Sequence, residues 1–479
     1  MASILYEVVR LTCPQVGICV SLLIFVGRKA MGISLLHLPL RFPTFTGGVH
    51  PDDNKRHTAH LKIEELSAPK KMIFPTLQNA GAPGEVVVEV GDSVKVGQLL
   101  IKQCGIISAN HHCSVSGTVI AIEPHLHPCG SHVKSVIVEN DEKYEVFRNI
   151  KPLGHPENLT KEEIIKAVSN AGIVGMGGAA FPTHIKLSPP SGKKINHIII
   201  NGAECEPFLT SDYRVMLEDT DELLIGCGAL LKAVDASECI IVAESNKKDA
   251  IAKIKQNPIY QKNEKIKTAI VKTKYPQGGE KQLLSAVLKK EVPPGGLPAD
   301  IGAVVVNIDT CAAVARSITT GMPLITRVVT VSGGAVANKR NFKVRIGTPV
   351  ADAINAVGGF TAEPAKILLG GPMMGVAIHS TDIPVTKGVG AILALTEKDV
   401  GIKVTTNCTQ CGKCVDVCPM NLMPTIIDRY CENFDAEMLE KLNIADCIEC
   451  GSCTFICPAR RDPLQRIRTA KKKINAFKK

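Results

Sequence analysis

Tryptophan is absent from the 479 residues, and aromatic residues make up only 4% of them. A surface that stacks single-stranded nucleic acid needs aromatic rings, so this composition argues against such a role. Zinc-finger spacing with paired histidines is also absent, and nucleic acid is therefore not an expected partner. Hydrophobic residues at 45% and charged residues at 21% are typical of a globular chain. Its length predicts three or four domains.

Apolar runs long enough to span a bilayer comfortably are also missing. The best candidate, Val16 to Val26, is too short for a membrane helix. Pro14 and the lack of a small-residue cleavage pattern weaken its interpretation as a signal peptide. We expect residues 1–41 to form an extension that is disordered or begins upstream of the native start, with a membrane anchor as the alternative.

Basic residues are concentrated at the end of a chain whose formal net charge is +10. Nine Lys or Arg and one acid, Asp462, lie between Arg460 and Lys479. Such a run can be a solvated tail, or it can face an anionic membrane surface or an acidic partner protein.

Eighteen cysteines are many for this length. Eight of them fall into two compact runs rather than a disulfide framework, which indicates metal binding in a reducing compartment. Cys227, Cys239 and Cys311 lie in apolar stretches and are expected in the core.

The two runs share the spacing C-x2-C-x2-C-x3-C-P. In this pattern three thiolates bind one [4Fe–4S] cluster, and the fourth cysteine binds the other cluster. Zinc is the alternative, but it prefers paired C-x2-C units. One predicted cluster therefore has the ligands Cys408, Cys411, Cys414 and Cys457. The other has the ligands Cys447, Cys450, Cys453 and Cys418. Between them, Met423 to Leu442 is predicted to be helical rather than a pair of short hairpins.

Residues 85–140 are predicted to form short strands separated by turns that contain Gly and Pro, and one such strand is Val86 to Val90. This pattern resembles the barrel-sandwich hybrid of lipoyl and biotinyl carrier domains. The hairpin between the two halves, Ser108 to Cys113, has no lysine to modify, so a structural role is expected. His111 and His112 are interpreted as a surface pair that binds no metal.

Residues 155–325 alternate between helical and strand patterns, which predicts an α/β sheet. A long helix is expected from Ser211 to Ala233. Residues 326–396 form a smaller strand–helix–strand unit. The predicted boundaries are an extension (1–41), a barrel-sandwich region (42–150), an α/β domain (151–325), a small domain (326–396), a cluster domain (397–470) and a basic tail (471–479).

Four polar loops in the α/β region indicate a ligand site. Gly175 to Ala180 formally matches G-x-G-x-x-A, but a helix precedes it, so it is not a dinucleotide fingerprint. Glycines still let backbone N–H groups approach an anion. Asn201 to Pro207, Tyr275 to Glu280 and Asn307 to Thr310 each follow a predicted strand, where α/β sheets bind ligands.

These four loops look like the flavin- and NADH-binding loops of the complex I flavoprotein subunit. With Phe42 to Pro51 and the doubled cluster motif, residues 42–460 resemble the RnfC family, the C subunits of Rnf-type ion-translocating oxidoreductase complexes. The resemblance implies a multidomain α/β and α+β protein with a barrel-sandwich hybrid, a Rossmann-like flavin domain, a β-grasp domain of the soluble-ligand-binding type and a helical two-cluster ferredoxin module.

The resemblance also implies an FMN site. Its expected residues are Gly175, Gly177, Gly178, Lys186, Asn201, Glu204 and Asn307. Glu206 and Glu280 are expected to contact NADH. The complex I subunit has an Asp where this chain has Ala203, so nucleotide contacts there are expected to differ.

The implied function is electron exchange between NADH and partner subunits through FMN and two [4Fe–4S] clusters, with ion translocation by those partners. The implied location is peripheral, on the cytoplasmic face of the cell membrane, with ferredoxin as a further partner. Two alternatives stay open: a soluble flavin and iron–sulfur cobalamin reductase of the propanediol-utilisation type, and a cluster relay without flavin.

Overall fold

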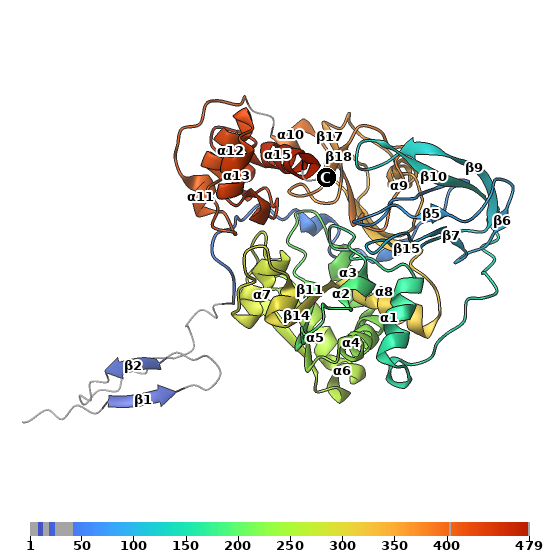
Figure 1. Cartoon of the computed structure of the whole chain (residues 1–479), viewed down its shortest axis with the longest axis horizontal. Coiled ribbons are helices and arrows are strands. Elements are labelled where there is room, and N and C mark those ends of the chain that lie inside the picture. Colours follow the sequence, from blue (N-terminus) through green and yellow to red (C-terminus); the bar gives the residue numbers. More distant parts are fainter. Residues whose placement is uncertain (1–7, 13–18, 24–41, 402–403, 478–479) are drawn as a thin grey trace, which may run out of the picture. The chain divides into compact units, whose positions relative to one another are not determined.

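The computed structural model describes residues 8–12, 19–23, 42–401 and 404–477, and the chain divides into two units, Met1–Arg41 and Phe42–Lys479. In the first unit, β1 (Val8–Thr12) pairs antiparallel with β2 (Cys19–Leu23). The other residues of the expected N-terminal extension lie outside the described part of the chain. Figure 1 colours the elements along the sequence.

Two small sheets form the barrel-sandwich region. One has the order β4-β10-β9-β6 and the other β5-β7-β8. Their strands are β4 (Lys71–Pro75), β5 (Glu85–Val86), β6 (Ser93–Val94), β7 (Leu99–Lys102), β8 (His111–His112), β9 (Gly117–Leu126) and β10 (His132–Asn140). The strand expected from Val86 to Val90 is therefore shorter than predicted, because Gly91 and Asp92 turn the chain towards β9, where each backbone bonds Val119.

The interpretation of His111 and His112 as a surface pair is wrong. Both side chains are buried between β7 and the neighbouring domains. Burial, with the charge of Lys387 nearby, lowers the pKa of His112 to about 3, and it lowers that of His111 well below its ordinary value. They are neutral interior residues.

The α/β domain contains a four-stranded sheet of order β13-β12-β11-β14, in which all neighbouring strands are parallel. Its strands are β11 (His197–Gly202), β12 (Glu238–Glu244), β13 (Ile266–Val271) and β14 (Ala303–Asn307). Its helices are α1 (Lys161–Asn170), α2 (Thr183–Lys186), α3 (Ser211–Glu218), α4 (Thr220–Val234), α5 (Lys248–Gln256), α6 (Pro258–Lys262), α7 (Glu280–Leu288) and α8 (Ile308–Thr319). The strands are continuous runs of Ile and Val, as expected for a parallel sheet buried on both faces.

The helix predicted from Ser211 to Ala233 is two helices. Asp219 leaves the helical conformation (φ −107°, ψ 38°) and separates α3 from α4. Its carboxylate lies 3.2 Å from Arg316 on α8. The break between α3 and α4 thus coincides with an ion pair to a distant helix. Local sequence periodicity does not reveal such a break.

The following domain contains a six-stranded sheet of order β18-β17-β19-β15-β16-β3. Its elements are β3 (Ile63–Glu65), β15 (Thr326–Ser332), β16 (Arg340–Arg345), α9 (Val350–Ala356), β17 (Lys366–Leu369), β18 (Val376–Ile378), β19 (Ala391–Leu395) and α10 (Glu397–Val400). Strand β3 comes from the N-terminal region and pairs in parallel with β16, so the two regions share one sheet.

The cysteine module is helical, as predicted (Figure 1). It contains α11 (Lys413–Asp416), α12 (Pro424–Asn433), α13 (Ala436–Lys441), α14 (Ser452–Ile456) and α15 (Pro463–Phe477). The helix expected from Met423 to Leu442 is divided at Phe434, whose backbone is left-handed (φ 46°), and Asp435 caps the next helix through Met438 N (3.0 Å).

The basic run comprises helix α15 and the residues just before it, and four of its cations face acids of the same module. Arg461 and Arg466 pair with Asp428 and Glu432, and Arg468 and Lys471 pair with Glu449. The solvated-tail alternative is therefore wrong for these four residues. None of the helices within residues 42–401 and 404–477 has the length and apolar content that a membrane crossing needs.

Helices α4 and α8 approach so closely that the packing depends on Gly226. A Cβ atom there would lie 2.1 Å from the Cys311 carbonyl oxygen, whereas a Cβ on Gly228 would meet nothing within 4 Å. We predict that Gly226→Ala destabilises the chain by about 1–3 kcal/mol through overpacking. Gly228→Ala, the matched control, should stabilise it slightly through helix propensity. Thermal unfolding under anaerobic conditions measures both; equal midpoints would contradict the close approach.

Candidate functional site

Three of the four loops predicted to bind a ligand, those that follow β11, β13 and β14, meet at the carboxyl edge of the parallel sheet. The Asn201 side-chain amide donates to the Gly278 carbonyl (2.8 Å), which links the loops after β11 and β13. Lys186 Nζ lies 2.8 Å from Glu280 Oε1 and 3.2 Å from the Val305 carbonyl oxygen, which links α2, α7 and β14. The topology thus brings together residues that are 77 to 119 positions apart in the sequence.

The glycine-rich loop enters this edge from the side of α1. Met176 N donates to Thr310 Oγ1 (2.8 Å), and a Cβ on Gly177 would lie 3.0 Å from Asn307 Nδ2. Gly178 faces open space, since a Cβ there would meet nothing within 4 Å. The Asn307 side chain accepts from Asp309 N (3.0 Å) and caps α8. A glycine loop and a helix start therefore lie side by side, an arrangement that suits an anionic group.

Two buried acids line the same edge. Glu204 has a left-handed backbone (φ 21°) at a position that is not glycine, which is typical of a constrained functional loop. Its Oε1 accepts from Asp212 N (2.8 Å), and Asp212 Oδ2 accepts from the Asn307 amide (2.7 Å). Burial, with the charge of Glu204, raises the pKa of Asp212 to about 7.

These residues fit a bound FMN. Glu204 Oε2 and Asp212 Oδ1 are buried and have no hydrogen-bond partner among the described residues, so they remain acceptors for hydroxyl groups. Gly178 leaves room for close approach to the backbone, and Lys186 offers a partly exposed cation. Hydroxyl, phosphate and planar ring systems are the groups that such a combination recognises.

Glu206 and Glu280 differ in their surroundings. Both carboxylate oxygens of Glu206 accept backbone N–H groups, from Met373 (3.1 Å) and Met374 (2.8 Å). Burial raises the pKa of Glu206 to about 7 despite these bonds. The Glu280 side chain is 38% exposed. Glu280 is thus accessible as it stands, whereas a ligand contact to Glu206 requires release of the loop at Met373 and Met374.

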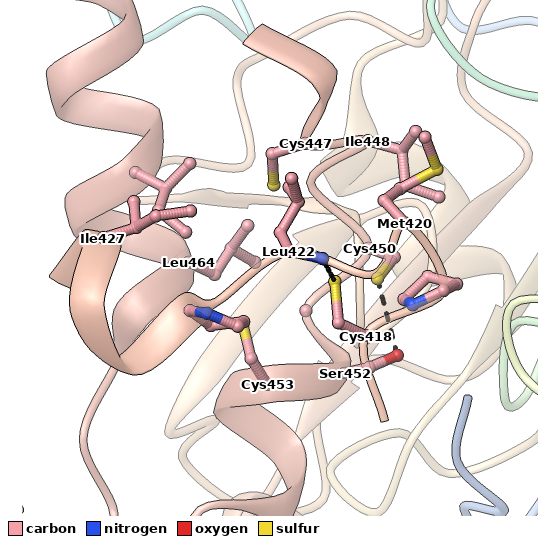
Figure 2. Close-up of a pocket in the computed structure, with 14 residues that line it drawn as sticks. Cys418, Met420, Leu422, Ile427, Cys447, Ile448, Cys450, Ser452, Cys453 and Leu464 are labelled. Carbon is pink, nitrogen blue, oxygen red and sulfur yellow. Dashed lines mark hydrogen bonds between the residues drawn. The ribbon is translucent and has the colours of Figure 1, made fainter. Parts of the chain in front are cut away.

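The second cysteine set surrounds a cavity. Cys447, Cys450 and Cys453 line it together with Cys418 from the other motif, and the remaining lining is mostly apolar (Figure 2). Leu422 N donates to Cys418 Sγ (3.3 Å), and Glu449 N donates to Cys447 Sγ (3.4 Å). The cavity thus brings together the four cysteines of the crossed set predicted from spacing, and their binding of one cluster stays a prediction. N–H···S bonds of this kind are characteristic of cluster thiolates.

No set of three His, Cys, Asp or Glu within the described ranges is close enough to hold a single metal ion. A cubane cluster binds each thiolate through a different iron, so its ligands stand further apart than those of one ion. Burial raises the pKa of the Cys447 thiol to about 11, and deprotonation there depends on metal binding. The four thiols around this one cavity match the ligand number of a [4Fe–4S] cluster.

The first set is more open. Cys408 and Cys411 are exposed, whereas Cys414 and Cys457 are half-buried. Helices α11 and α14 pack together, which brings the two motifs into contact. The motifs repeat with an offset of 39 residues (447 − 408), and the left-handed backbones repeat with it, at Gln410 (φ 54°) and Glu449 (φ 57°). The two cysteine loops thus share this left-handed position, although the two cysteine sets differ in burial.

The second set lies against the loop that carries Tyr275 and Glu280. The Tyr275 hydroxyl donates to the Cys450 carbonyl (2.7 Å), and Gly48 N donates to the Val417 carbonyl (2.8 Å). The apolar contacts at this junction, termed the bridge, involve Val49, Tyr275 and Cys450 with Cys205, Met373, Val417, Ile448 and Ile456. The flavin loops and one cluster cavity are therefore in direct contact.

Asp212, Asp309 and Arg327 belong to the site, but sequence patterns do not identify them. Burial would raise the pKa of Asp309, yet Arg327 and Arg316 hold it below its ordinary value. Arg327 stands near the start of a strand of the neighbouring domain, where a charged residue is usually interpreted as solvent-facing. Asp212, Asp309 and Arg327 can be recognised as neighbours only when the packing of the two domains is known.

Four family models match the chain in the order of its domains. They are the RnfC barrel sandwich hybrid domain (residues 43–143), the Nuo51 FMN-binding domain (168–316), the SLBB domain (328–377) and a 4Fe-4S dicluster domain (407–461). The fold and the cofactor predictions, FMN and two [4Fe–4S] clusters, are confirmed at this level. The class is a flavin and iron–sulfur electron-transfer protein.

Two curated relatives match over nearly their full length. The C subunit of the proton-translocating ferredoxin:NAD(+) oxidoreductase complex of Clostridium ljungdahlii is 44% identical, covering 90% of this chain and 94% of the relative. The C subunit of the Na(+)-translocating complex of Acetobacterium woodii is 43% identical, covering 90% and 97%. The chain belongs to the RnfC family of Rnf-type ion-translocating oxidoreductase complexes, and the resemblance stated from sequence is confirmed. It is thus one member of a multisubunit complex.

Among solved structures, an NAD+-reducing [NiFe]-hydrogenase in the H2-reduced state aligns with a TM-score of 0.47 at 18% identity, covering 68% of this chain and 65% of that chain.

Crossed ligation can be tested by iron content. We predict that Cys418→Ser and the double variant Cys418→Ser/Cys450→Ser each lose one cluster and keep half of the iron. Cys418→Ser/Cys411→Ser should lose both clusters, because its changes fall in different ligand sets. Cys431→Ser, half-buried on α12 outside both motifs, is the matched control. Iron analysis with electron paramagnetic resonance gives the answer, and the reverse pattern of the two double variants would overturn the assignment.

The raised pKa of Asp212 predicts a pH-dependent stability. Between the ordinary value of 3.8 and about 7, the native chain keeps a proton that the unfolded chain releases, so this residue lowers stability as pH rises through that window. Asp212→Asn removes the effect. The variant should gain stability relative to the wild type from about pH 4 to pH 7 and then level off. Anaerobic thermal unfolding across this range measures it; a difference independent of pH would contradict the buried acid.

Proposed function

We propose that the chain exchanges electrons between NADH and its partner subunits, through FMN at the sheet edge and then through the two clusters. The observation that carries this proposal is the bridge, where the Tyr275 hydroxyl meets the Cys450 carbonyl at 2.7 Å. It puts a cluster cavity directly against a loop of the FMN-binding domain. The names of the relatives, which are subunits of ferredoxin:NAD(+) oxidoreductase complexes, support the same redox partners.

The residues have the following proposed roles. FMN is held by Gly175, Gly177, Gly178, Lys186, Asn201, Glu204 and Asn307. Lys186, fixed by Glu280 and the Val305 carbonyl, places a positive charge beside the bound group. Glu280, and Glu206 after movement of the loop at Met373, contact NADH. When bound, FMN exchanges a hydride with nicotinamide and single electrons with iron–sulfur clusters.

The difference in burial sets the proposed order of the two clusters. The set with Cys450 is enclosed beside the FMN-binding domain, and the set with Cys408 and Cys411 is exposed. A partner protein can approach only the exposed set closely. The exposed set is thus the proposed exchange point with the rest of the complex or with ferredoxin.

Attachment to the cytoplasmic face of the cell membrane through partner subunits completes the proposal. Membership of the Rnf-type family supports it, and NADH is available on that side. Ion translocation is assigned to the partners. The relatives at 44% and 43% identity are named for different ions, protons and Na(+), so similarity alone favours neither.

The first experiment is an anaerobic absorbance spectrum with flavin and iron analysis, followed by NADH addition. We expect FMN and two clusters in each chain, with both flavin and cluster bands bleached by NADH. Clusters without flavin, unresponsive to NADH even after FMN is supplied, would reduce the chain to a relay and overturn the proposal.

Glu280→Gln tests the NADH contact. Loss of the exposed carboxylate should raise the KM for NADH by about tenfold, the effect of one lost polar contact of about 1.4 kcal/mol. Iron content should not change, and KM is measured at saturating FMN because Glu280 also pairs with Lys186. Glu291→Gln is the matched control, since Glu291 follows the same helix α7 and is exposed. An unchanged KM for NADH in Glu280→Gln would remove this residue from the NADH site.

A further inference from the structure

We infer that Arg327, on strand β15 of the SLBB domain, is a positioning residue for the FMN site. It holds the middle of the glycine-rich loop and the start of α8 in fixed register, so that the SLBB domain forms part of the flavin site. The inference rests on the proposed FMN residues of the neighbouring domain.

The Arg327 side chain crosses from one domain to the other and is only 2% exposed. One terminal nitrogen lies 2.5 Å from Asp309 Oδ2, in the first turn of α8. The other donates to the Met176 carbonyl. Asp309 Oδ1 accepts from Arg316 at 3.0 Å, so both carboxylate oxygens of Asp309 are held. A planar guanidinium can make these two bonds in two directions at once, which a lysine ammonium cannot do in the same geometry.

These contacts fix the peptide groups on both sides of Met176. Its N–H donates to Thr310 Oγ1 (2.8 Å), and its carbonyl accepts from Arg327. The Met176 side chain is itself buried. The loop is thus anchored one residue before Gly177, which fixes the point from which the backbone of Gly177 and Gly178 extends. Small misplacements of such a loop cost binding, because backbone N–H groups must meet the ligand at hydrogen-bond distance.

The Arg327 side chain is also confined from the SLBB side. A Cβ on Gly390 would lie 3.1 Å from its terminal nitrogen, so the guanidinium packs against bare backbone. Arg327 Nε is buried without a hydrogen-bond partner in the described part of the chain. A fully buried ion pair is an expensive way to join two domains. The Arg327 guanidinium bonds the Met176 carbonyl and the start of α8 at the same time. An apolar pair could not make these two contacts.

The experiment measures FMN affinity of the full-length chain under anaerobic conditions, after removal of flavin, by quenching of FMN fluorescence. Arg327→Met should weaken FMN binding about ten- to hundredfold, as expected for lost charge-assisted bonds. Arg327→Lys should lie between this variant and the wild type, and saturating FMN should restore its kcat with NADH. Arg340→Met is the matched control, because Arg340 pairs with Glu64 on the adjacent strand without reaching the flavin domain.

Arg327→Met leaves Asp309 with one cation and can fold poorly, so the double variant Arg327→Met/Asp309→Asn is included. It removes both charges, and its thermal midpoint and iron content should approach those of the wild type. Its FMN affinity should stay about ten- to hundredfold weaker, since the bond to the Met176 carbonyl is still missing.

Two negative results remain distinguishable. A wild-type chain that binds no FMN would overturn the proposed function itself. Wild-type affinity in the folded double variant, or equal losses in Arg340→Met, would overturn only the role of Arg327.

Discussion

The buried ion pair between Arg327 and Asp309 joins two sheets that the chain builds separately. One end belongs to an antiparallel-containing sheet, and the other belongs to the helix that follows β14 of the parallel sheet. Removing two charges from water is costly, and the cost is offset only when each charge is fully bonded. Arg316 and the Met176 carbonyl supply further bonds to the pair, and among the described residues Arg327 Nε alone of its guanidinium nitrogens has no partner. The network therefore requires both domains to be in place at the same time.

The charge balance behind this pair explains the state of the remaining acids. Arg327 and Arg316 pair directly with Asp309, whereas within the described part of the chain Glu204 and Asp212 form no ion pair closer than 4 Å and feel Lys55, Lys247 and Arg327 only from further away. A proton is the simplest compensation, and the raised pKa of Asp212 expresses it. The site is thus a place where unsatisfied acceptors persist in a folded protein, a condition usually reserved for ligand binding.

Local patterns were sufficient wherever function depends on spacing within one segment. The pattern of Met423 to Leu442 predicts the helical module. The repeat of C-x2-C-x2-C-x3-C-P predicts that Cys418 joins the second cysteine set, because a short loop restricts where its thiolates point, and the structure places Cys418 at that cavity. Strand-then-polar-loop patterns likewise predict the sheet edge at Asn201 and Asn307. Arg327 and Asp212 were not predicted. Arg327 bonds the Met176 carbonyl, which lies more than a hundred residues away in the sequence. The pKa of Asp212 is raised mainly by burial, which a local sequence pattern does not reveal. The buried His111 was misjudged for the same reason: neighbouring domains cover it, and no local signal reports that.

Gly47 and Gly48 lie where the cysteine module approaches the flavin loops, and this approach bears on the proposed electron path. Cβ atoms on Gly47 and Gly48 would lie 2.9 Å from the Cys418 carbonyl oxygen and 2.5 Å from the Tyr275 carbonyl oxygen. Both backbones are also left-handed, at φ 81° and 79°. The close approach and the left-handed backbone each favour glycine at these two positions. This segment lies between the cysteine module and the flavin loops and lets them approach backbone to backbone. A bulkier segment would hold the buried cluster cavity away from the flavin edge, while leaving the exposed cysteine set unchanged. The close contact between the enclosed cysteine set and the flavin loops therefore depends on a short stretch that contains no redox residue.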